Sequence, residues 1–460
     1  MPQRPFSDAD RWILAAYAAV LLGLGLWRLL RRRREDVAGY LVAGRAISLP
    51  GFVANLVATW YGGILGVGEY SYRYGLSNWL VFGVPYYVAA ALFALFLAKR
   101  ARRSQACTIP DQLHAAYGPA AALLGSVVVF VMTLPGAYVL MAGKIASEIL
   151  GVPLAYAVVG VTLLSGFYLL FGGMRAIVAA DRFYFVLMFA SFGLIVPYLA
   201  AHHGGLEFLR RSLPPDHFTW NGGRPPQAIL VWYFIALSTL IEPSFYEACF
   251  SARSPRTAQR GLFVCILFWA LFDFLTTATG MYARALLPDL ADPVQAYPLL
   301  AERVLPSVAR GLFVVGMLAT VMSTVDSYLF ISAQTLGHDL LRRARRLAEG
   351  QEPNRLTRAC LLVSGATAIL VALTHVSVIS IWHDLGSIGT PALVVPLCAS
   401  FHPRWALRPR AAVTSIALSS AVAAAWLLSN RGGHGYWLGL EPIFPALAVS
   451  LAVWAIGRRV

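Results

Sequence analysis

The sequence has little charge for its length. Of its 460 residues only 13% are Asp, Glu, Lys or Arg, whereas 58% are hydrophobic. A soluble globular chain is nearer one quarter charged. Apolar runs of about 20 residues recur along the whole chain, and each is long enough to cross a bilayer as a helix. The composition excludes an ordinary soluble domain and predicts an all-α, polytopic membrane protein.

The sequence also lacks the motifs of several other classes of protein. Its five cysteines are scattered and form neither a metal-binding spacing nor a disulfide framework. There is no His-Glu-x-x-His, no Gly-x-Ser-x-Gly and no P-loop. We therefore expect neither an enzyme nor a cofactor. A transporter-like sensor remains an alternative, although it normally needs a signalling domain, for which the sequence shows no sign.

Basic residues outnumber acidic ones, and the net charge is +15. The basic residues gather in short loops between apolar runs, for example in the run 31–34, which favours the positive-inside pattern over a nucleic-acid-binding surface. When the apolar runs alternate across the bilayer from an outside N-terminus, most of the 37 basic residues fall on one side. This bias predicts a protein of the cell inner (plasma) membrane, with its N-terminus outside and its C-terminus inside.

About 13 transmembrane helices are predicted. The apolar segments are 11–30, 46–71, 78–98, 119–142, 153–171, 181–200, 228–250, 261–283, 311–336, 359–375, 379–400, 411–429 and 438–457.

Two of these segments contain helix-breaking residues. The segment 46–71 carries Gly62-Gly63, and the segment 228–250 carries Glu242-Pro243. Paired glycines alone are also typical of close helix packing in membranes. Here, however, each break lies in the first helix of a block of five, which is the pattern of an inverted-repeat transporter. We expect the chain to be divided into an N-terminal helix and basic loop, a first repeat, an external loop, a second repeat and two C-terminal helices, at 1–45, 46–200, 201–227, 228–400 and 401–460.

A polar cluster lies deep inside the apolar segment 311–336. It contains Ser323, Thr324, Asp326 and Ser327. A charged group at bilayer depth is costly, so it normally faces a cavity, a partner or an ion. Hydroxyl and carboxylate oxygens suit a small hard cation such as Na⁺. The alternative is that the hydroxyls bond back to carbonyls of their own helix.

From about Tyr40 to its end, the chain resembles the sodium:solute symporter family, which has the LeuT-like fold. The resemblance rests on several short matches in the right order: Tyr-Leu-Val-Ala-Gly-Arg at 40–45, Leu-Val-Ala-Thr-Trp-Tyr-Gly-Gly at 56–63, Phe-Gly-Gly-Met-Arg-Ala at 171–176 followed by Asp181, the segment 245–255, and Met-Ser-Thr at 322–324. The chain departs from the family at Glu247-Ala248, where the family usually shows Gln-Arg.

The resemblance implies a sodium site made by three main-chain carbonyls and two hydroxyls, those of Ala58, Tyr61, Thr320, Ser323 and Thr324. Asp181 matches an acid near the inner exit of that ion, but it could instead pair with Arg175 or Arg182. Some relatives hold an additional sodium between this acid and the positions of Asp326 and Ser327. A second ion site or ion exit is therefore expected at these three residues.

The candidates for contact with the solute or for gating are the polar and aromatic residues near the expected cavity: Trp60, Glu69, Glu242, His383 and Asp384. Glu69 could instead pair with Arg73, and His383 could cap or pack its helix. The function implied is sodium-coupled symport of a small organic solute into the cell by alternating access. The alternative within the same fold is coupling to protons carried by Asp181, Asp326 or His383. The sequence does not identify the solute.

Overall fold

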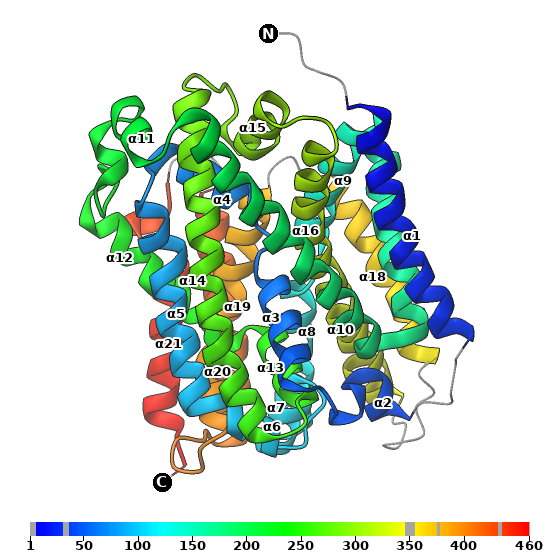
Figure 1. Cartoon of the computed structure of the whole chain (residues 1–460). Helices are drawn as coiled ribbons and strands as arrows, with labels where there is room; N and C mark the ends of the chain where they lie inside the picture. Colours follow the sequence, from blue (N-terminus) through cyan, green and yellow to red (C-terminus); the bar gives the residue numbers. More distant parts are fainter. Residues whose placement is uncertain (1–5, 31–35, 346–354, 375–377, 431–434, 460) are drawn as a thin grey trace.

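The computed structural model describes residues 6–30, 36–345, 355–374, 378–430 and 435–459, except for the side chains at 227, 228, 231 and 378–385. This part of the chain is a bundle of helices without a strand; two isolated β-bridges are its only extended pairings. Figure 1 shows long helices crossing the bundle from one face to the other. The all-α prediction is confirmed.

The long helices are α1 (Asp8–Leu30), α3 (Leu49–Trp60), α4 (Ile64–Tyr74), α5 (Val84–Phe93), α8 (Pro119–Met132), α9 (Gly136–Leu150), α10 (Leu154–His203), α12 (Pro226–Ile235), α14 (Pro255–Leu286), α16 (Ala309–Gln334), α18 (Arg355–Thr374), α19 (Val378–Ser400), α20 (Pro409–Ser429) and α21 (Ile443–Gly457). The short helices are α2 (Val37–Leu41), α6 (Lys99–Arg103), α7 (Ile109–Tyr117), α11 (Leu206–Ser212), α13 (Pro243–Ser251), α15 (Ala296–Val304) and α17 (Arg342–Ala344).

Within the described residues, eight helices are long and apolar enough to span a membrane, or nine when the bent pair α3 and α4 is counted as one span. The helix α10 alone covers the two predicted segments 153–171 and 181–200. It bends at Gly173, whose φ of 51° is open to glycine but strained for other residues. The exact number of thirteen spans stays a prediction.

Both predicted breaks are present. The helices α3 and α4 are bent by 61° at a break between Trp60 and Ile64. At the second break, the 3₁₀ segment η5 (Ala236–Ile241) is followed by Glu242, whose ψ of 115° is not helical, and α13 begins at Pro243. Proline has no N–H to donate and is tolerated in the first turn of a helix. The Glu242-Pro243 pair therefore ends one helix and starts the next.

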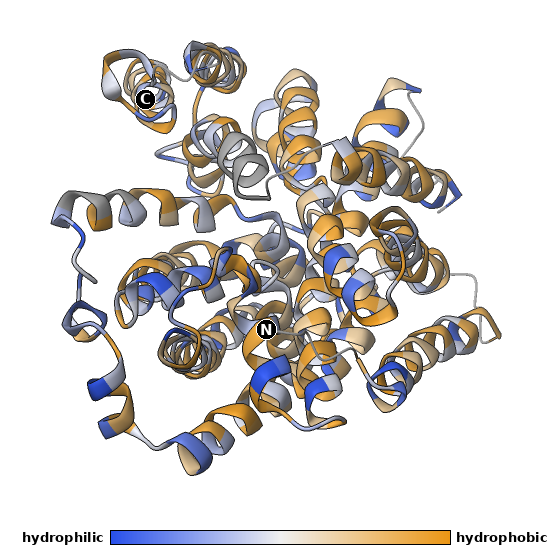
Figure 2. Cartoon of the chain, turned by 90° about the horizontal axis from the view of Figure 1, so that it is seen from above, coloured by the Kyte–Doolittle hydropathy of each residue, from blue (hydrophilic) through white to orange (hydrophobic). Residues whose placement is uncertain are grey.

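The helix α16 is the centre of the bundle. Nearly every residue from Arg310 to Gln334 is buried, and the helix packs against α10, α18, α9, α1 and α3. By contrast, the outer helices expose their apolar side chains, and apolar colour covers most of the helical ribbons in Figure 2. An apolar outside around a partly polar centre is the arrangement expected for a bundle that faces lipid.

The two ends of the bundle carry different short helices. The helices α11 and α15 lie at the face where α1 begins, which we name the α11 face (Figure 1). The helices α2, α6 and α7 lie at the opposite face, where α21 ends, which we name the α7 face (Figure 1). The chain thus enters and leaves the bundle at opposite faces.

A buried ion pair ties α1 to the start of α16. The Asp10 carboxylate accepts hydrogen bonds from the Arg310 guanidinium and, at 3.0 Å, from the Gly311 N–H, and both charged side chains are almost fully buried. We expect Asp10→Ala to lower the free energy of unfolding by about 3 kcal/mol, because it removes one partner of a buried pair. Thermal unfolding in detergent micelles measures this change.

The matched control is Asp8→Ala, two positions away on the same helix. Asp8 pairs with Arg11 at 3.4 Å, but its side chain is 88% exposed. Exposed pairs contribute little to stability, so this variant should melt like the unaltered protein. Equal melting temperatures for the two variants would contradict a structural role for the Asp10–Arg310 pair.

Candidate functional site

The break after α3 lies directly against α16. A Cβ atom on Gly62 would sit 2.4 Å from the Thr324 hydroxyl oxygen, so only glycine lets the backbone approach so closely. Tyr61 is fixed beside it, since its hydroxyl donates to the carbonyl oxygen of Trp269 at 2.9 Å and to Asp273 at 3.0 Å. The end of a helix leaves carbonyl oxygens without helical partners. At this point such carbonyls meet the hydroxyl groups of α16.

Two of those hydroxyls bond to other helices. The Ser323 hydroxyl donates to Asp181 on α10 at 2.5 Å, and the Thr324 hydroxyl donates to the carbonyl oxygen of Thr59 on α3 at 2.6 Å. Thr320 behaves differently, because its hydroxyl donates to the Met317 carbonyl of its own helix at 2.6 Å. Bonding back to the same helix therefore holds for Thr320 but not for Ser323 or Thr324.

Asp181 is fully buried at this junction. Its two carboxylate oxygens accept from Asn55 Nδ2 at 2.7 Å and from the Ser323 hydroxyl. Within the described chain it forms no ion pair with Arg175 or Arg182, the alternative that the sequence left open. Asp181 thus connects Asn55 of α3 with Ser323 of α16.

The remaining acidic and hydroxyl residues of α16 divide between two groups of contacts. Ser327 lies 3.1 Å from the Thr59 hydroxyl, which lies 3.3 Å from Ser323, so these three oxygens continue the chain that begins at Asp181. Asp326 takes other partners on α10: the hydroxyls of Ser165, at 2.5 Å, of Tyr184, at 3.2 Å, and of Tyr168. The carboxylates of Asp181 and Asp326 therefore have no hydrogen-bonding partner in common.

Trp60 ends α3 within an aromatic cluster. Its ring centroid lies 5.4 Å from that of Tyr86, 5.4 Å from that of Phe245 and 5.2 Å from that of Trp269. The side chain is only partly buried. Such a wall can stack against the apolar surface of a small molecule.

Glu242 lies at the second break and connects it to α16. It accepts from the Tyr328 hydroxyl at 2.8 Å and from the Ser244 hydroxyl at 3.2 Å, and it caps the start of α13. Tyr328 in turn packs edge to face against Tyr138, with 5.2 Å between ring centroids. A carboxylate whose partner is a tyrosine on a neighbouring helix can exchange that partner for a donor on a ligand.

The other candidates have less connection to the breaks. Glu69 pairs with Arg73 on α4 at 3.0 Å, which was the alternative for this residue. The side chains of His383 and Asp384 lie outside the part of the chain that the structure describes.

Several site residues were not found from the sequence. Asn55 and Thr59 are polar residues four positions apart in an otherwise apolar segment, so they lie on one face of α3. That spacing could have identified them, because polar residues at membrane depth normally face a polar partner. The partners of Asp326, namely Ser165, Tyr168 and Tyr184, carry no such signal.

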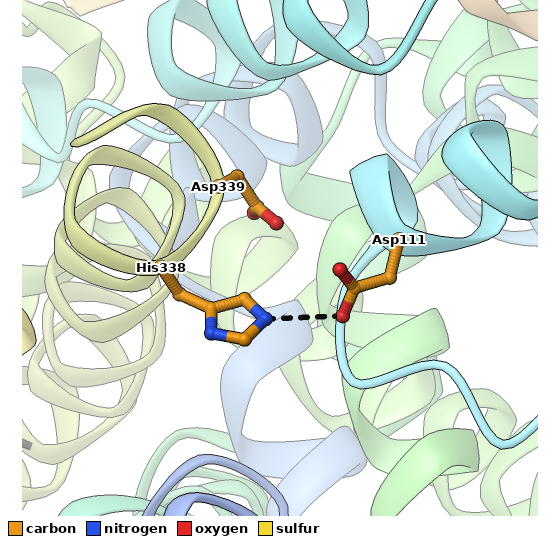
Figure 3. A group of neighbouring side chains, drawn as sticks. All are labelled: Asp111, His338 and Asp339. Carbon is orange, nitrogen blue, oxygen red and sulfur yellow. Dashed lines mark hydrogen bonds and ion pairs between the residues drawn. The ribbon is translucent and has the colours of Figure 1, made fainter. Parts of the chain in front are cut away.

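An ionic cluster lies at the α7 face. Figure 3 shows Asp111 of α7 opposite His338 and Asp339, which follow α16, with His338 Nε2 3.2 Å from Asp111. The three side chains have metal-ligating atoms within 4.8 Å of one another. Arg343 also pairs with Asp111, at 2.7 Å. Burial alone would raise the pKa of Asp111, but hydrogen bonding and attraction to His338 and the nearby arginines hold this pKa well below its usual range. Cationic side chains therefore already neutralise this cluster.

Two arginine side chains bind main-chain carbonyl oxygens at the α7 face. The Arg45 guanidinium donates to the carbonyl oxygens of Gln105, Ala106 and Phe250, at 2.5, 3.2 and 3.1 Å. Arg102 donates to the carbonyl oxygen of Ala252 at 2.5 Å. These bonds join the segment before α3, the segment before α7 and the end of α13.

Comparisons with known proteins agree with this geometry. The family model described as the sodium:solute symporter family matches residues 40–403. The sodium/pantothenate symporter of Escherichia coli (strain K12) is 26% identical, over 97% of this chain and 95% of its own length. The sodium/myo-inositol cotransporter 2 of Sus scrofa is 24% identical, over 80% of this chain and 62% of its own.

Among solved structures, the chain resembles a Na⁺-coupled sialic acid symporter in a substrate-bound outward-open state, with a TM-score of 0.80, 16% identity and 98% of each chain covered. It also resembles MhsT in complex with L-phenylalanine, with a TM-score of 0.56, 16% identity and 92% and 99% of the two chains covered. These likenesses establish the LeuT-like fold. Because the family model covers most of its length, the chain belongs to the sodium:solute symporter family and is a sodium-coupled solute symporter.

Proposed function

We propose that the coupling sodium binds where α3 breaks against α16. The ligands are the carbonyl oxygens of Ala58, Tyr61 and Thr320 and the hydroxyl oxygens of Ser323 and Thr324. The observation that carries the proposal is the direction of the two hydroxyls, which bond to α10 and α3 and not to their own helix. A hydroxyl that donates its proton keeps lone pairs for a cation.

Sodium in this position would hold α3 and α16 together. The first repeat contributes the broken helix, and the second repeat contributes the hydroxyls. A cation bound by both favours the arrangement in which they meet, and a solute that prefers the same arrangement then binds more tightly. Movement of the repeats 46–200 and 228–400 relative to each other would carry ion and solute across by alternating access.

We further propose that Asp181, Ser327 and Asp326 serve a second ion or the exit of the first. Asp181 shares the Ser323 hydroxyl with the proposed sodium site, and Ser327 is connected to it through Thr59. Asp326 has separate partners, which also lie on α10. The hydrogen-bonded chain from Ser323 to Asp181 gives the ion a polar path out of the break.

The proposed solute site lies between the two breaks. Trp60 offers an aromatic surface and Glu242 offers a hydrogen-bond acceptor held by Tyr328. Relatives of this chain are named for pantothenate and for myo-inositol. A small polar organic solute fits one apolar wall and a few polar groups. We propose uptake of such a solute into the cell.

We propose that the protein lies in the plasma membrane with the α7 face inside. The short helix α6 at that face carries Arg100, Arg102 and Arg103, as the positive-inside rule requires. A periplasmic-only reporter such as alkaline phosphatase, fused after Val460, should be inactive, whereas a reporter active only in the cytoplasm should be active. The reverse pattern would contradict the orientation.

The sodium site can be tested by removing both hydroxyls. We expect Ser323→Ala with Thr324→Ala to raise the sodium concentration for half-maximal uptake at least about tenfold. A hydrogen bond or ligand to a charged group contributes about 1.5–3 kcal/mol, and about 1.4 kcal/mol is a factor of ten. The affinity for the solute should fall with it. Uptake into proteoliposomes at varied external sodium measures both.

The matched control is Thr320→Val. It removes a hydroxyl one turn away that bonds to its own helix, but keeps the carbonyl proposed as a ligand. Its sodium dependence should stay within about twofold, since no ligand is lost.

Gly62→Ala should weaken sodium binding like the double variant, because its Cβ would collide with Thr324. Gly160→Ala is the control and should leave sodium binding unchanged, because a Cβ there has nothing within 4 Å. Unchanged sodium dependence in the double variant would show that the coupling ion binds elsewhere.

A further inference from the structure

A small cavity lies between the proposed sodium site and the α7 face. Its volume is about 20 Å³, enough for roughly one water molecule or one ion. Its lining includes Thr108 before α7, Tyr246 and Glu247 on α13, Gln334 at the end of α16 and Thr335 after it. Along α16, Gln334 is ten residues beyond Thr324, which corresponds to about 15 Å. The cavity therefore lies on the way from the sodium site to the α7 face.

Glu247 is the unusual member of this lining. Its side chain is 6% exposed, and its Oε1 atom has no hydrogen-bond partner. A buried polar atom without a partner is destabilising, and a buried carboxylate without a counter-charge is much more so. The residue after it, Ala248, supplies no charge. When it is ionised, Glu247 therefore needs a cation that the described side chains do not provide.

The charged groups around α13 do not meet that need. Arg45 and Arg102 donate to carbonyl oxygens at the end of the helix, those of Phe250 and Ala252. On the side of α7, Asp111 is paired with His338 and Arg343. The charge that does act on Glu247 is the carboxyl of Asp181, a like charge. Two carboxyls that repel each other both gain from a cation between or beside them.

We propose that Glu247 is a transient sodium site through which the ion leaves toward the α7 face. The proposal rests on the sodium site at Ser323 and Thr324, and it concerns where the ion goes after it leaves that site. Asp181 receives the ion first and Glu247 second, with the amide oxygen of Gln334 and the hydroxyls of Thr108 and Thr335 as neutral oxygen donors. One carboxylate, neutral donors and room for one small particle suit a monovalent hard cation better than a divalent one.

The test uses the whole protein in proteoliposomes with the α7 face toward the lumen. Glu247→Gln keeps the shape of the side chain and removes its charge. We expect sodium added to the lumen to inhibit uptake by the unaltered protein, and the half-inhibitory concentration to rise at least about tenfold in the variant, the effect of losing one charged ligand. Net uptake into a sodium-free lumen should slow several-fold. The external sodium concentration for half-maximal uptake should stay within about twofold of that of the unaltered protein. The rate of solute exchange with equal sodium on both sides should also stay within about twofold.

Two further variants guard against a general loss of structure. Glu247→Asp keeps the charge and should recover most of the luminal sodium inhibition. Cys249→Ala changes a buried residue on the same helix that does not line the cavity, and it should behave like the unaltered protein. Protein abundance in the vesicles is measured for each.

Three results would overturn the proposal. Unchanged luminal inhibition in Glu247→Gln would leave Glu247 as a neutral structural carboxyl. A change in dependence on luminal pH, with sodium inhibition unaltered, would make a proton the occupant. If only the external sodium concentration for half-maximal uptake rose, the effect would lie at the sodium site of Ser323 and Thr324 and not at Glu247. Failure of the sodium site itself would appear instead in the Ser323 and Thr324 double variant, through the external sodium dependence.

Discussion

The structure depends on hydrogen bonds between α16 and the broken end of α3. Ser323, Thr324 and Asp181 are all fully or almost fully buried, and each has its partner on another helix. Within a bilayer such groups gain little from remaining on the surface of a single helix, because no water is there to satisfy them. The break at Gly62 and the polar stretch of α16 therefore require each other. Without the break, the Thr324 hydroxyl would lose its acceptor on α3. Without that hydroxyl, the Thr59 carbonyl oxygen would lose its donor on α16.

This interdependence explains how a nearly fully buried helix can carry the polar residues Ser323, Thr324, Asp326 and Ser327. Helix α16 packs against five neighbouring helices, and Ser323, Thr324 and Asp326 find donors or acceptors on α3 and α10. A cation bound at the junction would add to contacts that already exist. Because those contacts join α16 to α3 and α10, the occupancy of one small site can bias the arrangement of these helices.

The fold class and both breaks could be predicted from the sequence because each depends on local chemistry, and the sodium role of Ser323 and Thr324 stays a prediction. Glycine and proline at membrane depth mark breaks wherever they occur, and hydroxyls beside an acid mark a polar site. Long-range pairing was harder to predict. Nothing in the sequence places Tyr168 and Tyr184 against Asp326, or Tyr328 against Glu242, since these contacts depend on how helices far apart in the chain pack. Glu69 is the opposite case, because its ion pair with Arg73, four residues further along the same helix, could be predicted from the spacing alone.

The most direct test is a structure determined twice, in sodium and with sodium replaced by a large organic cation such as choline. The proposal predicts a density peak, present only in sodium, surrounded by the carbonyl oxygens of Ala58, Tyr61 and Thr320 and the hydroxyl oxygens of Ser323 and Thr324. The Thr324 hydroxyl should remain directed toward α3 in both. A sodium-dependent peak found only between Asp181 and Asp326, or no difference at the break, would contradict the central claim.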